Sequence, residues 1–450
     1  VASLILGAAA FADSELGAIA GVMFPLFVRA IGVITSIIGI LAVTPRSETE
    51  HGMKAINRGF FLSAAISAGA VFVLSQVYLD DWRPAAAVAI GLVLASVIQV
   101  LTQYFTDTKY KPVQEIAEST VTGPATTILS GFSIGLESTV WSVLIIAGAV
   151  MGSFYLGDNL AEQLYFIALT GMGMLTTVGV VVSMDTYGPI SDNAQGIAEM
   201  SGEFEGRPAE ILGGLDAVGN STKAITKGMA IATAVLAATS LFGSFFEALG
   251  SAGLELEARN QFRDHPGIMD YTEKPDYGRV VDICTRTSLR ELMTPGLLAV
   301  LSPVIAGFFL GAEALGAFLA GSILTGQLLA VMLSNAGGAW DNAKKFIEEG
   351  HYGGKGSEAH TAAVIGDTVG DPFKDTAGPA LNPLIKVMNL VALLIAPIVV
   401  SHTDDTAIRV AVVAIAAVVL ASMIWVSKSR KSELGDEIKQ RDVAGAPTPS

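Results

Sequence analysis

The chain is organised around Gly366-Asp-Thr-Val-Gly-Asp-Pro-Phe-Lys-Asp-Thr-Ala-Gly-Pro-Ala-Leu-Asn382. In it, Asp367, Asp371 and Asp375 recur every four residues. On a helix this spacing places three carboxylates on one face, with Lys374 beside them. Carboxylates stacked so closely repel one another unless cations lie among them. Mg²⁺ suits such oxygen ligands together with water and phosphate oxygens, so the stretch predicts a metal and phosphate site.

The same stretch leads into the apolar segment 384–400, which is long enough to cross a bilayer. Apolar residues make up 51% of the chain, charged residues only 15%, and the mean hydropathy is +0.56. Many of the 48 glycines allow helices to approach closely. The net charge of −15 argues against a nucleic-acid partner, and the single cysteine, Cys284, excludes a disulfide framework. We therefore expect an all-α, polytopic transmembrane helical bundle surrounded by membrane lipid.

Apolar segments of spanning length recur along the chain. They are expected at 1–12 (a truncated helix), 17–43, 58–79, 85–105, 121–152, 161–184, 222–248, 293–312, 314–339, 380–401 and 405–427. Arg and Lys in loops 44–58 and 106–120, and in the tail 428–450, place these parts in the cytoplasm. The same count of crossings places 185–215 and 340–379 on the cytoplasmic side.

The middle of the chain has one crossing fewer than this topology requires. Between 216 and 292 only 222–248 has spanning length, and 251–292 is rich in Arg and Lys, as a cytoplasmic loop would be. The expected organisation is a transmembrane domain, 1–427, followed by a cytoplasmic tail, 428–450. Because the chain starts inside an apolar run rather than with Met, we expect an N-terminal part to be missing.

Four polar blocks interrupt the apolar background at the ends of predicted membrane helices, where acids and lysines are costly unless paired or metal-bound. They read DTYGPISDNAQGIAEM from Asp185, LDAVGNSTKAITKG from Leu215, GGAWDNAKKFIE from Gly337 and AAVIGDTVGDPFKDTAGPALNPLIK from Ala362. In the second block, helical spacing places four polar residues on one face: Asp216, Asn220, Lys223 and Lys227.

These four blocks, in this order, closely resemble those of the membrane-bound pyrophosphatases, ion pumps driven by pyrophosphate hydrolysis. The likeness extends over 1–427 and includes QEIA from Gln114 and TGPAT from Thr122. It implies pyrophosphate as substrate, a proton as the transported ion, Mg²⁺ as cofactor and a homodimer. It also implies a multi-pass protein of the prokaryotic inner membrane whose catalytic face is cytoplasmic.

The resemblance also implies roles for individual residues. The ligands of Mg²⁺ would be Asp192, Asn220, Asp341, Asp367 and Asp371. Three lysines would contact phosphate oxygens: Lys227, Lys344 and Lys374. Asp375 would help to orient the attacking water, and Lys386 would belong to an ionic gate in the membrane. For Asp185 and Asp216 a ligand role and a structural role remain open, and Lys345 is expected to be a solvated or headgroup lysine.

Two departures from the family pattern carry expectations of their own. The family has sixteen helices and an Asp-rich block that would lie upstream of Val1, so the resemblance implies that this chain starts within the sixth helix. It also implies that about one further helix is missing near 243–256, ahead of the loop matched by 259–262. We therefore expect the chain alone to be catalytically incompetent. The acid that balances Lys386 is expected to come from the absent N-terminal helices.

The family divides into K⁺-dependent and K⁺-independent members, and two positions of the second block distinguish them. Here these positions are Lys223 and Thr226, and the Lys223 ammonium is expected to replace a monovalent cation, which implies a proton pump. Lys223 extending to the membrane surface is the alternative. Two other functions remain open: a sodium-pumping pyrophosphatase and a non-hydrolytic secondary cation transporter. An intramembrane metalloprotease is excluded because no HExxH pair is present.

Overall fold

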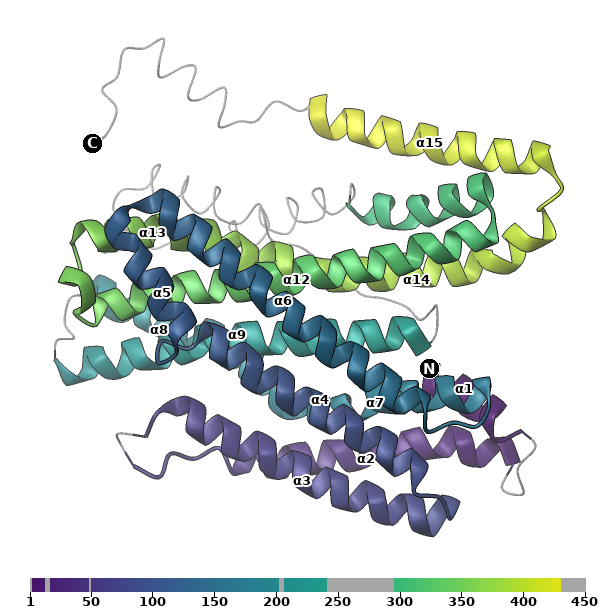
Figure 1. Cartoon of the computed structure of the whole chain (residues 1–450), viewed down its shortest axis with the longest axis horizontal. Helices are drawn as coiled ribbons and strands as arrows, with labels where there is room; N and C mark the ends of the chain where they lie inside the picture. The colour runs from purple at the N-terminus through teal and green to yellow at the C-terminus, as the bar shows by residue number, and fades with distance from the viewer. Residues whose placement is uncertain (1, 13–16, 48–49, 202–205, 241–294, 430–450) are drawn as a thin grey trace. The chain divides into compact units, whose positions relative to one another are not determined.

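The computed structural model describes residues 2–12, 17–47, 50–201, 206–240 and 295–429. Within these ranges every regular element is a helix, as the sequence predicts (Figure 1). The helices are α1 (Ala2–Ala10), α2 (Gly17–Leu41), α3 (Gly52–Leu79), α4 (Arg83–Thr106), α5 (Lys111–Ser119), η1 (Thr120–Thr122), α6 (Pro124–Phe154), α7 (Leu160–Thr176), α8 (Val178–Ser201), α9 (Arg207–Ser240), a helix Pro295–Leu310, α12 (Ala312–Glu348), η3 (His351–Gly353), α13 (Glu358–Pro372), η4 (Phe373–Ala377), α14 (Gly378–Ser401) and α15 (Thr406–Ser429).

In the described ranges, seven helical stretches are long and apolar enough to cross a membrane. The pair α7 and α8 forms an eighth candidate, but the two helices are bent by 51°. The apolar segment predicted at 161–184 thus covers α7 and the first residues of α8, and the bend interrupts it. The prediction that one helix of the family is missing near 243–256 concerns residues outside the described part of the chain.

Side-chain hydrogen bonds from the end of α7 and from α2 surround the bend between α7 and α8. The hydroxyls of Thr176 and Thr177 donate to the carbonyls of Gly173 and Met174, and such side-chain bonds compete with the helical backbone ladder. Two side chains of α2 donate hydrogen bonds to the backbone carbonyls at the break. Arg29 donates to the Leu175 carbonyl, and Ser36 Oγ donates to the Thr176 carbonyl at 2.9 Å.

The chain divides into two compact units. The first comprises 1–248 and 320–390, and the second comprises 249–319 and 391–450. In the first unit, buried apolar side chains of α3, α4, α8 and α9 form a common core, which includes Phe60, Ile98 and Ile225. In the second, Leu315 and Leu319 pack on Ala306 and Ala392, and Arg409 donates to the carbonyls of Phe308 and Phe309.

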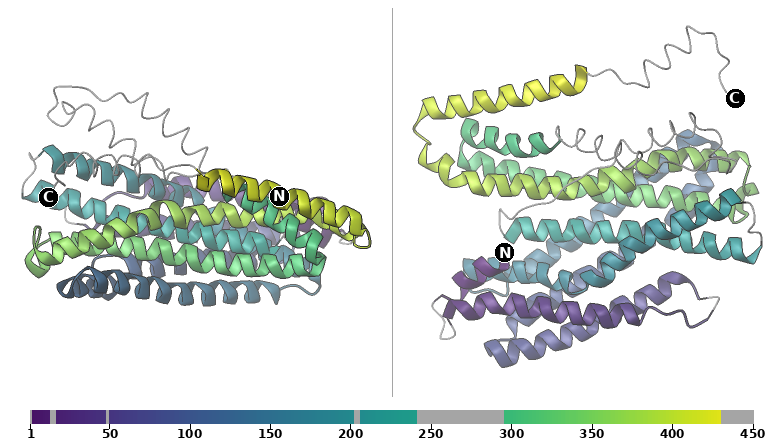
Figure 2. Two further views of the ribbon diagram at one scale, coloured as in Figure 1. Left: turned by 90° about the horizontal axis from the view of Figure 1, so that it is seen from above. Right: turned by 180° about the vertical axis from the view of Figure 1, so that it is seen from behind.

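The helices that carry the third and fourth polar blocks are longer than a membrane requires. α12 has 37 residues and is about 55 Å long, whereas the apolar core of a bilayer is about 30 Å thick. α13, η4 and α14 follow one another without a break over 44 residues (Figure 2). The predicted spans 314–339 and 380–401 are therefore parts of longer helices. The polar blocks lie on these rigid helices rather than on loops.

Candidate metal and phosphate site

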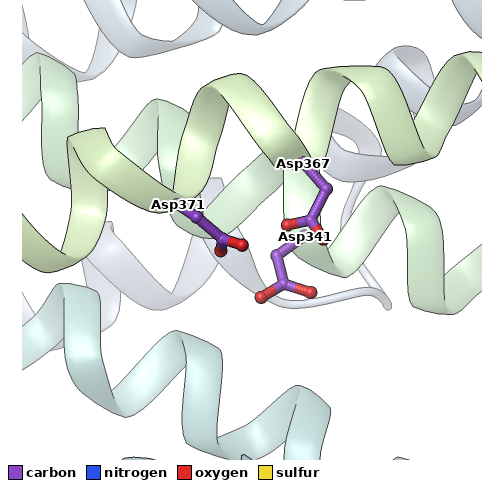
Figure 3. Close-up of side chains that lie close together, drawn as sticks. All are labelled: Asp341, Asp367 and Asp371. Atoms are coloured by element: carbon purple, nitrogen blue, oxygen red, sulfur yellow. The ribbon is translucent and has the colours of Figure 1, made fainter. Parts of the chain in front are cut away.

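Three carboxylates converge where α12 meets α13. Asp341, Asp367 and Asp371 each offer one oxygen, and these oxygens all lie within 4.8 Å of one another (Figure 3). Asp341 and Asp367 are buried, with 6% and 7% of their surface exposed, whereas Asp371 is exposed. In each buried carboxylate, Oδ1 is enclosed but accepts no hydrogen bond from a described residue. Buried carboxylate oxygens that accept no hydrogen bond fit a divalent cation such as Mg²⁺, although Lys344 Nζ lies 3.4 Å from Asp341 Oδ1.

Two glycines bring these helices into direct contact. A Cβ atom on Gly337 would lie 2.6 Å from the carbonyl oxygen of Gly370, and one on Gly370 would lie 3.0 Å from the Trp340 ring. Any larger residue at Gly337 would therefore push α12 away from α13. Trp340 is fully buried and donates from Nε1 to the Thr127 carbonyl of α6 at 2.9 Å. The Gly-Gly-Ala-Trp-Asp motif thus sets the position of Asp341.

Two lysines lie among the three carboxylates. Lys374 is almost completely buried and contacts both Asp341 and Asp371, the latter at 2.7 Å. It projects from η4, a π-helical turn, and such turns occur frequently at functional sites. Lys344 contacts Asp367, and its Nζ lies 3.4 Å from Asp341 Oδ1. Three carboxylates and two ammonium groups leave one net negative charge, so the cluster favours a further cation rather than a free anion.

The two lysines of α9 are paired with acids from other helices. Lys227 Nζ lies 3.2 Å from Asp375 Oδ1 and also contacts the Lys374 carbonyl. Lys223 Nζ lies 2.8 Å from Asp192 Oδ2, and Lys223 is buried. The alternative in which Lys223 extends to the surface therefore does not fit its burial.

Close contact between α8 and α9 brings Lys223 and Asp192 together. A Cβ atom on Gly188 would lie 2.6 Å from Lys223 Cγ, and one on Gly219 would lie 2.2 Å from Ser191 Oγ. Thr226, one turn further along α9, donates to Asp185 Oδ1 at 2.7 Å. Asp185 thus accepts a hydrogen bond from α9 and has a structural role in this structure.

Asn220 faces Asn342, a residue that the sequence analysis did not single out. Asn220 Nδ2 donates to Asn342 Oδ1 at 3.2 Å, and Asn220 Oδ1 is buried without a hydrogen-bond donor among the described residues. Asn342 Nδ2 in turn donates to the carbonyls of Thr106 and Ala217 and therefore joins α12 to α4 and α9. Its place next to Asp341 in the third block was the only sequence signal for this role.

Lys345 is not a solvated lysine, so that expectation is wrong. It is 8% exposed, and its Nζ lies 2.9 Å from Asp216 Oδ2 and 3.6 Å from Glu348 Oε2. Burial raises the pKa of Asp216, and the nearby Lys345 ammonium opposes that shift. The pair joins α9 to α12. Asp216 is therefore a structural partner of Lys345 in this arrangement.

The predicted residues form three sets of contacts, and the contact of Lys227 with the Lys374 carbonyl links two of these sets. Asp341, Asp367 and Asp371 form a cluster with Lys344 and Lys374. The other sets are the Lys227–Asp375 pair, which joins α9 to η4, and the Lys223–Asp192 pair, which joins α9 to α8; α9 also carries Asn220. Lys386 lies on α14, half-buried, and makes no ion pair with an acid in the described part of the chain.

Comparison with known proteins gives a consistent assignment. The family model described as "Inorganic H+ pyrophosphatase" matches residues 1–259 and 247–395. The chain is 52% identical to a K(+)-insensitive pyrophosphate-energized proton pump of Streptomyces avermitilis and 52% identical to one of Streptomyces coelicolor; each alignment covers 97% of this chain and 64% of the relative. It is 44% identical to a putative K(+)-stimulated pyrophosphate-energized sodium pump of Clostridium tetani, over 89% of this chain and 64% of that relative. The chain therefore spans about two thirds of the length of these relatives, and it belongs to the inorganic H⁺ pyrophosphatase family.

Proposed function

We propose that this chain forms the larger part of a pump that hydrolyses pyrophosphate and moves protons across a membrane. The observation that carries the proposal is the cluster of Asp341, Asp367 and Asp371 with Lys344 and Lys374 interleaved. Its net charge of one negative unit suits pyrophosphate only when divalent cations are bound with it. A simple anion-binding site would instead be positive overall.

Asp341, Asp367 and Asp371 would hold Mg²⁺, and Asp192 and Asn220 would complete the ligand set from α8 and α9. When bound, Mg²⁺ neutralises the charge of the phosphate oxygens and of the leaving phosphate. Lys344 and Lys374 are positioned by their carboxylates so that each can donate to a phosphate oxygen. Lys227 holds Asp375 at 3.2 Å, and this carboxylate would accept a proton from the attacking water.

Lys223 supports proton transport without a requirement for K⁺. Its buried ammonium already supplies a fixed positive charge beside Asp192, where a dissociable cation would otherwise be needed. The names of the two Streptomyces relatives describe K⁺-insensitive proton pumps. The Clostridium tetani relative is named a putative sodium pump. The assay must therefore distinguish sodium transport from proton transport.

The decisive experiment joins this chain to the segment of the Streptomyces coelicolor relative that it does not cover, and reconstitutes the product in vesicles. We expect Mg²⁺-dependent phosphate release from pyrophosphate together with acidification of the lumen, unaffected by Na⁺ or K⁺. Phosphate release without acidification, or acidification only with Na⁺ present, would contradict the proton-pump assignment. The chain alone, assayed in parallel, tests the expectation that it is inactive by itself.

We further propose that the pump is a homodimer of a prokaryotic inner membrane with its catalytic face in the cytoplasm. The apolar helices and the membrane pumps among the relatives support the multi-pass part of this proposal. The basic residues of loops 44–58 and 106–120 support the orientation. Cross-linking of the reconstituted protein and protease protection in oriented vesicles test the dimer and the orientation separately.

A further inference from the structure

A cavity of about 890 Å³ lies in the first unit, where α2 ends and α3 begins, against α8 and the first turns of α9. Its lining includes seven large apolar side chains: Ile40, Val43, Ile56, Val180, Met184, Ile211 and Leu215. A cavity of this volume is in the range that holds a ligand. No residue of the metal and phosphate site lines it, so a ligand bound there would be separate from that site.

Four ionisable groups line this cavity besides Tyr187, but two of them are already neutral or paired. Glu50 makes an ion pair with Arg58 at 2.9 Å, and it also accepts a hydrogen bond from the Arg46 backbone N–H at 2.6 Å. Burial lowers the pKa of His51, so this imidazole is neutral at pH 7. The remaining charges are the Arg46 guanidinium and the Glu210 carboxylate.

Arg46 and Glu210 are both exposed, and neither makes an ion pair within the described ranges. Among the described residues that line the cavity, Arg46 and Glu210 are therefore the two charged side chains for which no ion pair is found, and most of the other lining residues are apolar. This combination complements a head group that carries a phosphate and an ammonium, with an apolar chain attached. An inorganic anion would use Arg46 alone and would leave the apolar interior filled with water, which is unfavourable.

We propose that this cavity binds one zwitterionic phospholipid of the phosphatidylethanolamine type. One acyl chain lies among the apolar side chains, the phosphate pairs with the Arg46 guanidinium, and the ammonium donates to the Glu210 carboxylate. The location fits, because Ile40 and Ile56 are close to the ends of two membrane-spanning helices, the depth at which lipid head groups begin. A purely anionic head group would leave Glu210 unpaired, and a choline head group has no N–H to donate.

Native mass spectrometry of the chain in mild detergent tests the proposal. The chain is incubated with equal amounts of phosphatidylethanolamine, phosphatidylcholine and phosphatidylglycerol that carry the same acyl chains. We expect each chain to retain one phosphatidylethanolamine molecule. The retained amount should be about tenfold higher than for either of the other two lipids, because one charged contact distinguishes their head groups. Wild-type protein that retains no lipid, or that prefers phosphatidylglycerol, overturns the proposal.

Two adjacent glycines of α9 provide a matched pair of variants. Gly214 lines the cavity, Gly213 does not, and a Cβ atom on either would meet nothing within 4 Å. Both lie inside a helix, so Leu is tolerated at either position. We expect Gly214→Leu to weaken lipid retention, because its side chain takes up part of the space for the acyl chain, and Gly213→Leu to leave retention unchanged. Equal retention by the two variants would show that the lipid binds elsewhere, which also overturns the proposal.

The head-group contacts are tested by charge removal. Arg46→Gln is expected to weaken retention of all three phospholipids, whereas Glu210→Gln is expected to remove only the preference for ethanolamine over choline. Lys54→Gln removes a nearby charge that does not line the cavity and serves as the control. An unchanged preference in Glu210→Gln overturns the head-group assignment. Retained lipid mass requires neither pyrophosphate nor transport, so these outcomes are independent of the proposed pump.

Discussion

The Nζ atom of Lys345 lies 2.9 Å from Oδ2 of Asp216, and both side chains are buried between α9 and α12. The pair connects the helix that carries Lys223 and Lys227 to the helix that carries Asp341. A buried charge without its partner is far costlier than the intact pair. The contact therefore holds two parts of the candidate site in a fixed relation.

The first prediction concerns this pair. Lys345→Met leaves the Asp216 carboxylate buried and unpaired, and we expect a loss of about 3 kcal/mol in unfolding free energy. The thermal unfolding of the purified chain in detergent measures the change. The double variant with Asp216→Leu should recover most of the loss, since no buried charge remains. Lys111→Met, at an exposed lysine, serves as the control, and equal effects of the two lysine variants would contradict the prediction.

The second prediction concerns pH. Burial lowers the pKa of His51, so the folded protein favours the neutral imidazole. The stabilisation is present above the unfolded pKa of about 6.5 and is lost as the pH falls through the lowered folded pKa. The unfolding temperature should therefore fall between pH 7 and pH 5.5, and it should fall less in His51→Gln. Identical pH profiles for the two proteins would show that His51 is not the group responsible.

The third prediction concerns the bend between α7 and α8. A Cβ atom on Gly32 would lie 2.7 Å from the Cα of Thr176, so Gly32→Ala forces α2 away from the bend. We expect a loss of about 1–3 kcal/mol, the usual cost of overpacking, again measured by thermal unfolding. Gly69→Ala is the matched control in α3, because nothing lies within 4 Å of its Cβ position. That variant should be neutral or slightly stabilising, since Ala favours helix over Gly.

The fourth prediction concerns the cation site. Lys374→Gln removes an ammonium that competes with a metal ion for Asp341 and Asp371, so Mn²⁺ as a probe for Mg²⁺ should bind about tenfold more tightly. Asp371→Asn should weaken Mn²⁺ binding by a similar factor. Electron paramagnetic resonance of free Mn²⁺ gives both affinities without any need for turnover. Asp158→Asn, at a remote exposed acid, should change neither. Weaker Mn²⁺ binding in Lys374→Gln would argue against a metal between these carboxylates.

The fifth prediction concerns K⁺. In the reconstituted pump, pyrophosphate hydrolysis should not respond to K⁺, because Lys223 already places a fixed charge beside Asp192. Lys223→Ala should lower hydrolysis, and added K⁺ should restore part of it. Strong stimulation of the wild type by K⁺ would overturn the assignment. The conservative variant Lys223→Arg should remain insensitive to K⁺ if the charge alone matters.

Local patterns in the sequence were enough to predict the all-α class of the fold, though not the full length of every helix. Runs of apolar residues can satisfy their backbone groups in a membrane only as helices, so composition and run length predicted an all-α bundle. The four-residue spacing of Asp367, Asp371 and Asp375 likewise predicted a shared face. Asp367 and Asp371 do lie together with Asp341, whereas Asp375 pairs with Lys227 of α9. Helical geometry operates over a few residues, so one sequence is sufficient to infer it.

Pairings between distant helices were decided only by the tertiary structure. The burial of Lys345 depends on Asp216, 129 positions earlier in the chain, and no local pattern shows that the two will meet. The bend at Thr177 was missed for the same reason, because Arg29 and Ser36 of α2 take the carbonyls at the break. A charged or polar group is stable in the interior only beside its partner, and packing selects that partner. The sequence therefore determined which residues carry charge along each helix, and the packing of helices at Gly337, Gly188 and Gly32 decided which of those charges meet.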